Sequence, residues 1–207
     1  MPGSRKKQGD IKSQEIEQLL KSPNILDRFK AVDILAEKRD VGKLISLLYS
    51  ESWHLREKVQ DALSQFTLNE LRDKLLPLLN ERMWFVRAGA IRVLGNLYAK
   101  EVVMKQEVEG IGKEIESEHN IEPMELMPLH LQREKDNELL MEAYNLIYPY
   151  LKERNEVVRA NSAVALAKIT VKAPAIKEKI SKDDLIVIGN HLRELKEFAL
   201  LEKFMNL

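Results

Sequence analysis

Hydrophobic residues recur at helical spacing along most of the chain, and their pattern repeats around four arginines. The segments are DRFKAVDILAEK, LREKVQDALSQF, VRAGAIRVLGNL and VRANSAVALAKI. Counted from each arginine, positions −1, +3, +6, +7 and +10 are mostly apolar and fall on one stripe of an α-helix. The residue at +8 is always small, which lets another helix approach closely on a second side. These arginines, called the arginine column below, are Arg28, Arg56, Arg87 and Arg159.

Each arginine-centred helix has predictable neighbours. Asn24, Ser52 and Asn155 stand four residues before three of the arginines, where a polar side chain can cap a helix. Met83 takes this place in the third segment, which leaves Asn80 as the candidate cap there. An apolar helix is predicted ahead of each segment, over residues 11–21, 41–49, 68–79 and 137–152, and the prolines within two of them predict a local bend. The chain therefore reads as a two-helix unit repeated about every thirty residues.

Three parts depart from the repeat. Residues 1–10 are polar and basic, and we expect a flexible tail there. Arg87 and Arg159 are 72 positions apart, so the stretch 100–136, with its Met-rich MELMPLHL, is either a degenerate unit or an inserted helix with a loop. Residues 183–205 are predicted to form a terminal helix that covers the apolar face of the last unit. Residues 11–207 are expected to form a single domain.

The strings VRAGAIRVLGNL from Val86 and NEVVRANSAVALA from Asn155 resemble the second helix of a HEAT repeat. The resemblance implies an all-α fold, an α-α superhelix built as a HEAT-like solenoid of about four to five helix pairs. It also implies a protein-interaction scaffold without catalytic activity. For the arginine column it implies a structural role, through a polar or acidic neighbour in the adjacent unit, in preference to an anion-binding row.

Composition narrows the choice of partner. Among 207 residues, Lys+Arg and Asp+Glu number 33 each, and this balance argues against a nucleic-acid partner, which favours a basic surface. Cysteine is absent from the sequence, which fits a reducing compartment. No apolar run reaches the length of a membrane span. We therefore expect a cytoplasmic protein that does not enter a membrane.

The sequence contains no recognisable catalytic or metal-binding motif. Its histidines lack the i, i+4 spacing of a helical zinc pair, and no glycine-rich phosphate loop is present. Glu118–His119 and Asp183–Asp184 could exchange protons but have no oriented partner. We expect no enzyme activity, no metal and no cofactor. The histidines are His54, His119, His130 and His191.

Outward-facing positions of the second helices supply the candidate binding surface. With the apolar stripe and the small column buried, positions +2, +5 and +9 should line the concave face of a solenoid. Their mixed charges predict another protein or peptide of mixed charge as partner. Trp53 and Trp84 occupy the same place in consecutive units, where core packing is the expectation and an interface anchor the alternative. The concave ridge comprises Lys30, Asp33, Glu37, Lys58, Asp61, Gln65, Arg92, Asn96, Asn161 and Lys168.

Three other functions stay open at this point. HEAT-like bilin lyases hold a tetrapyrrole or its acceptor protein. DNA-alkylation-repeat glycosylases use a related fold on damaged DNA, although they need a basic groove that the charge balance disfavours. Finally, the chain could be a subunit whose terminal faces dock onto another protein.

Overall fold

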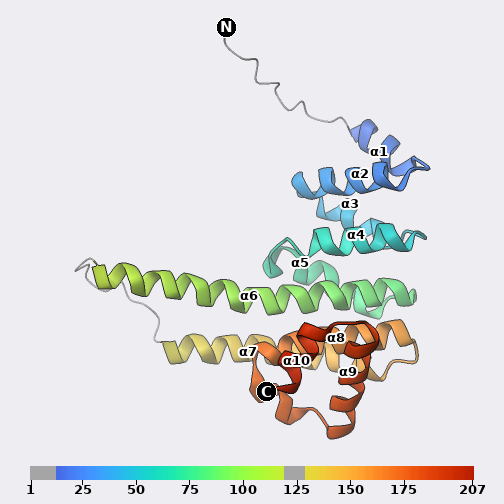
Figure 1. The fold of residues 1–207 in the computed structure, drawn as a ribbon. Helices are drawn as coiled ribbons and strands as arrows, with labels where there is room; N and C mark the ends of the chain where they lie inside the picture. The colour runs from blue at the N-terminus through green and yellow to red at the C-terminus, as the bar shows by residue number, and fades with distance from the viewer. Residues whose placement is uncertain (1–12, 119–128) are drawn as a thin grey trace. The chain divides into compact units, whose positions relative to one another are not determined.

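A computed structural model describes the backbone of residues 13–118 and 129–207 and the side chains of residues 13–101 and 134–207. The predicted tail at 1–10 and most of the Met-rich segment lie outside the described residues. Helices without any strand make up the regular structure of the described residues (Figure 1), so the predicted all-α architecture of packed helix pairs is confirmed. The chain divides into two compact units, Met1–Leu63 and Ser64–Leu207. That residues 11–207 form one domain stays a prediction.

The first unit consists of two helix pairs. Helix α2 packs against α1 and α3, and α2 and α4 lie side by side as second helices of consecutive pairs. Asn24 caps α2 by accepting a hydrogen bond from the Leu26 amide at 3.0 Å, and Ser52 accepts one from the Leu55 amide at 3.4 Å, as predicted. The helices are α1 (Ser13–Lys21), α2 (Ile25–Glu37), α3 (Val41–Leu47) and α4 (Trp53–Leu63).

The second unit holds two longer pairs and a C-terminal group. Both prolines predicted to bend a first helix, Pro77 and Pro149, lie at the start of a 3-10 turn that ends that helix. Asn80 ends such a turn and does not cap the next helix, so that prediction was wrong. The elements are α5 (Leu68–Leu75), η1 (Leu76–Asn80), α6 (Trp84–Glu118), α7 (Leu129–Ile147), η2 (Tyr148–Lys152), α8 (Glu156–Lys172), η3 (Pro174–Lys179), α9 (Lys182–Glu194) and α10 (Phe198–Met205).

Helices α6 and α8 form the core of the second unit. Their predicted stripe residues are buried, and Gly95 marks the point of closest approach, where an added Cβ would lie 2.9 Å from the Ala165 Cα. The small residue at Gly95 therefore allows the backbones of α6 and α8 to approach closely, as the sequence predicts. The buried stripe comprises Val86, Ala90, Val93, Leu94 and Leu97 of α6 and Val158, Ser162, Ala165, Leu166 and Ile169 of α8.

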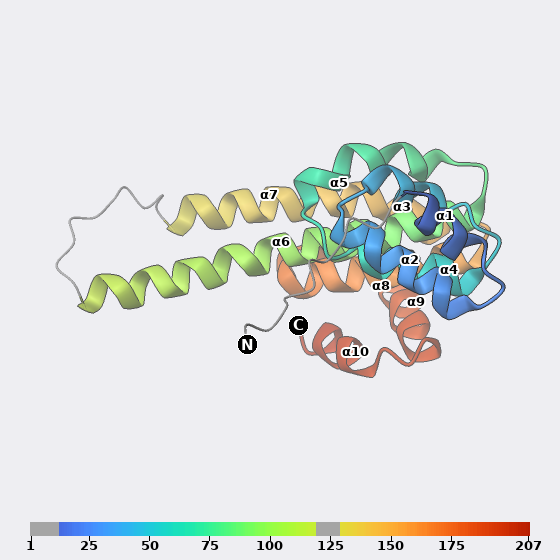
Figure 2. The same cartoon turned by 90° about the horizontal axis from the view of Figure 1, so that it is seen from above.

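The stretch 100–136 lengthens two helices of this unit. Helix α6 continues to Glu118, and α7 begins at Leu129 and runs back antiparallel to it. The two helices lie side by side in both views and extend past the helices that pack on their other ends (Figures 1 and 2).

The predicted terminal helix at 183–205 is two helices. Lys196 adopts a φ of 60°, and the Glu197 amide donates to the Leu192 carbonyl at 2.8 Å. This left-handed residue with a bond back over five positions is how a helix commonly ends, so α10 turns back towards α9. The same geometry ends α2, where Arg39 has a φ of 54°.

Candidate partner-binding surface

The arginine column makes one repeated contact. Each arginine lies in the first turn of a second helix, and its guanidinium turns back to the segment that follows the first helix. In Arg56, Arg87 and Arg159, Nη1 donates to the carbonyl oxygens six and five residues earlier, at distances between 2.6 and 3.0 Å. In Arg28, Nε donates to the carbonyl six residues earlier, that of Ser22, at 2.6 Å.

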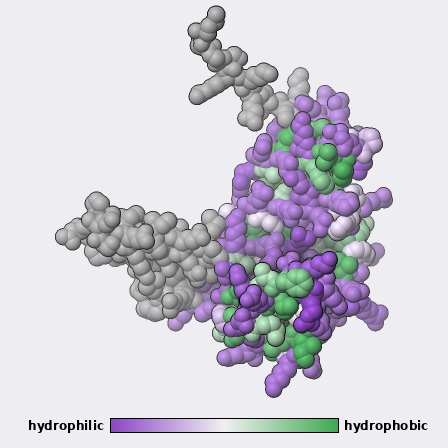
Figure 3. Space-filling model, in the orientation of Figure 1, coloured by the Kyte–Doolittle hydropathy of each residue, from purple (hydrophilic) through white to green (hydrophobic). Residues whose placement is uncertain are grey.

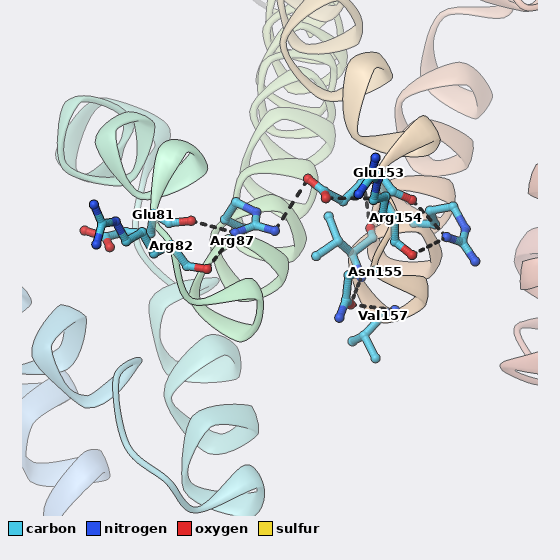
Figure 4. Close-up of polar contacts among 10 residues, drawn as sticks. Glu81, Arg82, Arg87, Glu153, Arg154, Asn155 and Val157 are labelled. Atoms are coloured by element: carbon cyan, nitrogen blue, oxygen red, sulfur yellow. Dashed lines mark hydrogen bonds and ion pairs between the residues drawn. The ribbon is translucent and has the colours of Figure 1, made fainter.

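These bonds tie the start of each second helix to the segment that follows the first helix of the same pair. The carbonyls at the end of a helix lack a partner within that helix, and a charged donor satisfies them well. Figure 4 shows this for Arg87, whose Nη2 also lies 3.5 Å from Glu153 Oε2. Arg87 therefore contacts a residue of the next helix pair. The partners that all four arginines share, however, are backbone carbonyls of their own pair. Burial lowers the pKa of Arg56, whose residue is 8% exposed.

The concave ridge of the first unit is an exposed, charged surface on α2 and α4. Lys30, Asp33, Glu37 and Asp61 are exposed, and Lys58 is half-buried. Lys58 Nζ lies 2.6 Å from Asp33 Oδ1, which joins the ridge positions of the two second helices. An ion pair this exposed adds about 0–1 kcal/mol to stability.

The ridge of the second unit is joined by a chain of hydrogen bonds. Lys168 Nζ of α8 donates to Asn96 Oδ1 of α6 at 2.7 Å, and Asn96 Nδ2 donates to Ser64 Oγ at 3.0 Å. The structure thus brings together ridge positions from two second helices and the residue that follows α4. Asn161 instead turns back to donate to the Val157 carbonyl of its own helix at 2.9 Å. Gln65 is exposed, and Arg92 is half-buried.

The two tryptophans lie at the surface, so the expectation of core packing was wrong. Trp53 is 59% exposed and Trp84 is 39% exposed. Each begins a second helix, ahead of the buried stripe, and its ring packs against the next side chain: His54 at 4.8 Å and Phe85 at 5.6 Å between ring centroids. A large aromatic side chain in such a position is available to a partner.

A polar cluster that the sequence did not reveal joins the first three helices of the second unit. Glu142 Oε1 of α7 accepts bonds from Arg72 Nε and Nη2 of α5, at 3.0 and 2.5 Å, and from Tyr98 OH of α6 at 2.9 Å. Burial raises the pKa of Tyr98 to about 12. Burial alone would raise the pKa of Glu142, but the bonds from Arg72 and Tyr98 outweigh it and lower that pKa.

Neither described histidine takes part in a group of metal ligands. His54 is exposed, and His191 Nδ1 lies 3.3 Å from Glu194 Oε2. Within residues 13–101 and 134–207, whose side chains the structure describes, no three or more His, Cys, Asp or Glu side chains gather where they could hold a metal ion. The side chains of His119 and His130 lie outside the described residues. Among the described helices, none is both long and apolar enough to span a bilayer.

Comparison with known proteins finds a family model that matches the first half of the described helices. Residues 13–103 match the family model of HEAT repeats. The match begins with α1 and ends within α6, and it includes three of the four arginine-centred helices. No curated protein matches the chain. HEAT repeats generally serve as protein-interaction scaffolds, and the family is typically non-enzymatic.

Proposed function

We propose that this chain, in which residues 13–103 match the HEAT-repeat model, acts as a non-enzymatic scaffold that binds another protein along its concave ridge. One observation carries the proposal. In each unit, polar side chains at ridge positions of consecutive pairs bond to one another: Asp33 with Lys58, and Asn96 with Lys168. Such a surface is continuous from helix to helix, as partner binding by a helical repeat requires.

Charge complementarity defines the kind of partner. The ridge of the first unit carries three carboxylates and two lysines, from Lys30, Asp33, Glu37, Lys58 and Asp61. That of the second unit carries Arg92 and Lys168 beside neutral amides. A polyanion would be repelled by the first set, whereas a protein segment with both acidic and basic residues can pair with each set in turn.

The bonded ridge pairs reduce the cost of binding. Long charged side chains lose about 0.5–1.5 kcal/mol each when a partner immobilises them. Lys58 and Lys168 already bond to Asp33 and Asn96, at 2.6 and 2.7 Å, which restricts part of that freedom before a partner binds. A partner that accepts this arrangement therefore meets a partly preorganised surface.

Affinity capture with charge-reversed variants tests the proposal. Lys30 and Glu37 are exposed on α2, so the double variant Lys30→Glu with Glu37→Lys reverses the sign of two ridge charges without changing the net charge. The matched control reverses Lys21 and Glu15, which are exposed on the first helix of the same pair. Full-length tagged variants would be incubated with extract of the source cells, and bound proteins would be quantified by mass spectrometry.

We expect at least one protein to be captured by the parent and the control variant and to be lost with the ridge variant. Reversing a rim charge changes association mainly through electrostatics, so this capture should also weaken as salt rises. Equal capture by all three proteins would contradict the assignment of the ridge. Loss with the control variant alone would move the binding surface to the first helices.

A further inference from the structure

The C-terminal helices line an open cavity that the repeat pattern does not predict. Helices α9 and α10 and the turn η3 surround a space of about 330 Å³. Ligand pockets in proteins run from about 300 to 1,000 Å³, so this one has room for a single anchoring group. Its lining includes Lys177, Leu185, Ile186, Arg193, Phe204 and Met205.

Backbone geometry explains why the space is open. The left-handed residue Lys196 turns α10 back beside α9, and Phe204 of α10 is buried at 1% exposure. On the α9 side, Gly189 contributes no side chain, and a Cβ there would meet nothing nearer than Leu201 Cδ1 at 3.9 Å. The cavity therefore lies between Gly189, which has no side chain, and the buried Phe204 of α10.

The mouth of the cavity is apolar and exposed. Ile186 is 62% exposed and Met205 63%, and Phe198 on the same helix pair is 59% exposed. Figure 3 shows hydrophobic surface gathered where Figure 1 places α9 and α10, bordered by hydrophilic side chains. Large apolar side chains beside a hollow are typical of a binding site.

The polar lining of this cavity is cationic. Lys177 Nζ donates to the Phe204 carbonyl at 3.3 Å, at the end of α10, and lies 5.8 Å from the centre of the Phe204 ring. Arg193 Nη1 donates to Asn190 Oδ1 at 3.1 Å. Among the described residues, the side chains that line the cavity include these two cations and no carboxylate. An anionic group is therefore the complement that the site favours.

We propose that this cavity is a second binding site, for a peptide segment of a partner protein in which a large apolar side chain is flanked by carboxylates. The apolar side chain enters the hollow between Ile186, Met205 and Gly189. The flanking carboxylates pair with Lys177 and Arg193. The site is separate from the concave ridge and does not depend on it.

Fluorescence anisotropy with a defined probe tests this site on the full-length protein. The probe is a fluorescein-labelled peptide with one Phe between pairs of Glu in a Gly/Ser frame. Two matched peptides replace Glu by Lys or Phe by Ser. The protein variants are Ile186→Ser and Arg193→Glu, both at exposed positions, with Leu195→Ser and Arg154→Glu as controls at exposed positions that do not line the cavity.

The acidic Phe peptide should bind saturably below about 1 mM, and the two matched peptides should bind at least about fivefold more weakly. Ile186→Ser and Arg193→Glu should each weaken binding at least about fivefold, while the two controls keep the affinity of the parent. Circular dichroism establishes that each variant is folded.

Three results would overturn the assignment: no binding of the acidic peptide, equal binding of the Lys peptide, or unchanged affinity in both cavity variants. If the protein bound phosphatidylserine vesicles but none of the peptides, the ligand of this cavity would be a lipid surface and not a peptide. The ridge variant Lys30→Glu with Glu37→Lys should leave peptide binding unchanged, so failure of the ridge and failure of the cavity are distinguishable.

Discussion

Gly95 lies where α6 comes closest to α8, and replacing it by alanine adds one methyl group at that point. Alanine is favoured over glycine within a helix by about 1 kcal/mol, so sequence preference alone predicts stabilisation. The added Cβ, however, would lie 2.9 Å from the Ala165 Cα, which is a backbone atom that cannot move without moving α8. Overpacking of a core costs about 1–3 kcal/mol, and more where backbone must shift. We expect Gly95→Ala to destabilise the second unit by about 1–2 kcal/mol.

Gly189→Ala is the matched control. It lies within α9, and its Cβ would meet only Leu201 Cδ1 at 3.9 Å, an ordinary contact. This substitution should stabilise the protein by about 0.5–1 kcal/mol through helix preference and the lower entropy of the unfolded chain. The two glycine-to-alanine changes should therefore have opposite signs.

Urea unfolding followed by tryptophan fluorescence measures both effects. The chain has two tryptophans, and Trp53→Phe leaves Trp84 of α6 as the reporter of the second unit. The added Cβ would also clash with the Ala165 Cβ, which Ala165→Gly removes while the Cα stays in place. Ala165→Gly in the Gly95→Ala background should therefore recover part of the loss, and the double-mutant cycle should give a coupling energy of about 1 kcal/mol or more. If Gly95→Ala were as stable as Gly189→Ala, the close packing of α6 on α8 would be refuted.

Three further predictions follow from single contacts. Arg159→Met removes two charge-assisted bonds to carbonyls and should destabilise the second unit by about 2 kcal/mol in urea unfolding. A variant that keeps the stability of the parent but loses anion binding would contradict a structural role. The pKa of Glu142 is lowered in the folded protein, so its carboxylate stabilises the fold above the ordinary glutamate pKa of 4.5, and this effect is lost as pH falls through the folded-state pKa. On acidification, the thermal midpoint of Glu142→Gln should therefore drop less than that of the parent. An equal drop would count against the cluster. Lys196→Gly relieves a left-handed φ of 60° and should stabilise the protein by about 0.5–1 kcal/mol, which a lower thermal midpoint would disprove.

Local signals in the sequence were sufficient for much of the fold. The spacing of apolar residues around the arginine column depends on helical geometry alone, and the buried stripes of α6 and α8 follow it. Caps such as Asn24 and Asn155 act on amides two or three residues away, so they too could be predicted. The break between α9 and α10 could not, because lysine at position 196 seldom takes a left-handed conformation.

Contacts between distant residues account for most of what the sequence did not reveal. Arg72 and Glu142 are 70 positions apart, and no motif marks either of them. Trp53 and Trp84 are exposed because each is the first residue of its helix, ahead of the buried stripe. The general preference of tryptophan for protein cores does not indicate this. The carbonyl partners of the arginine column are a different case. They lie six residues before each arginine and, for Arg56, Arg87 and Arg159, also five residues before it, so the contact is local and only the repeated arginine marks it in the sequence.

Of the concave ridge, the sequence predicted the positions but not their bonds. Five of its ten residues are exposed, namely Lys30, Asp33, Glu37, Asp61 and Gln65, and the other five are half-buried. The bond between Asn96 and Lys168 depends on the closeness of α6 and α8, which the small residue at Gly95 permits. Binding of a partner at these positions stays a prediction.

Site-specific photo-crosslinking tests the scaffold proposal most directly. A benzophenone amino acid would be placed at position 30 on the ridge or at position 21 on α1, and each protein would be irradiated in extract of the source cells. The account predicts that a partner protein is crosslinked from position 30 and not from position 21. Crosslinking from position 21 with none from position 30 would contradict it, because the partner would then lie on the first helices.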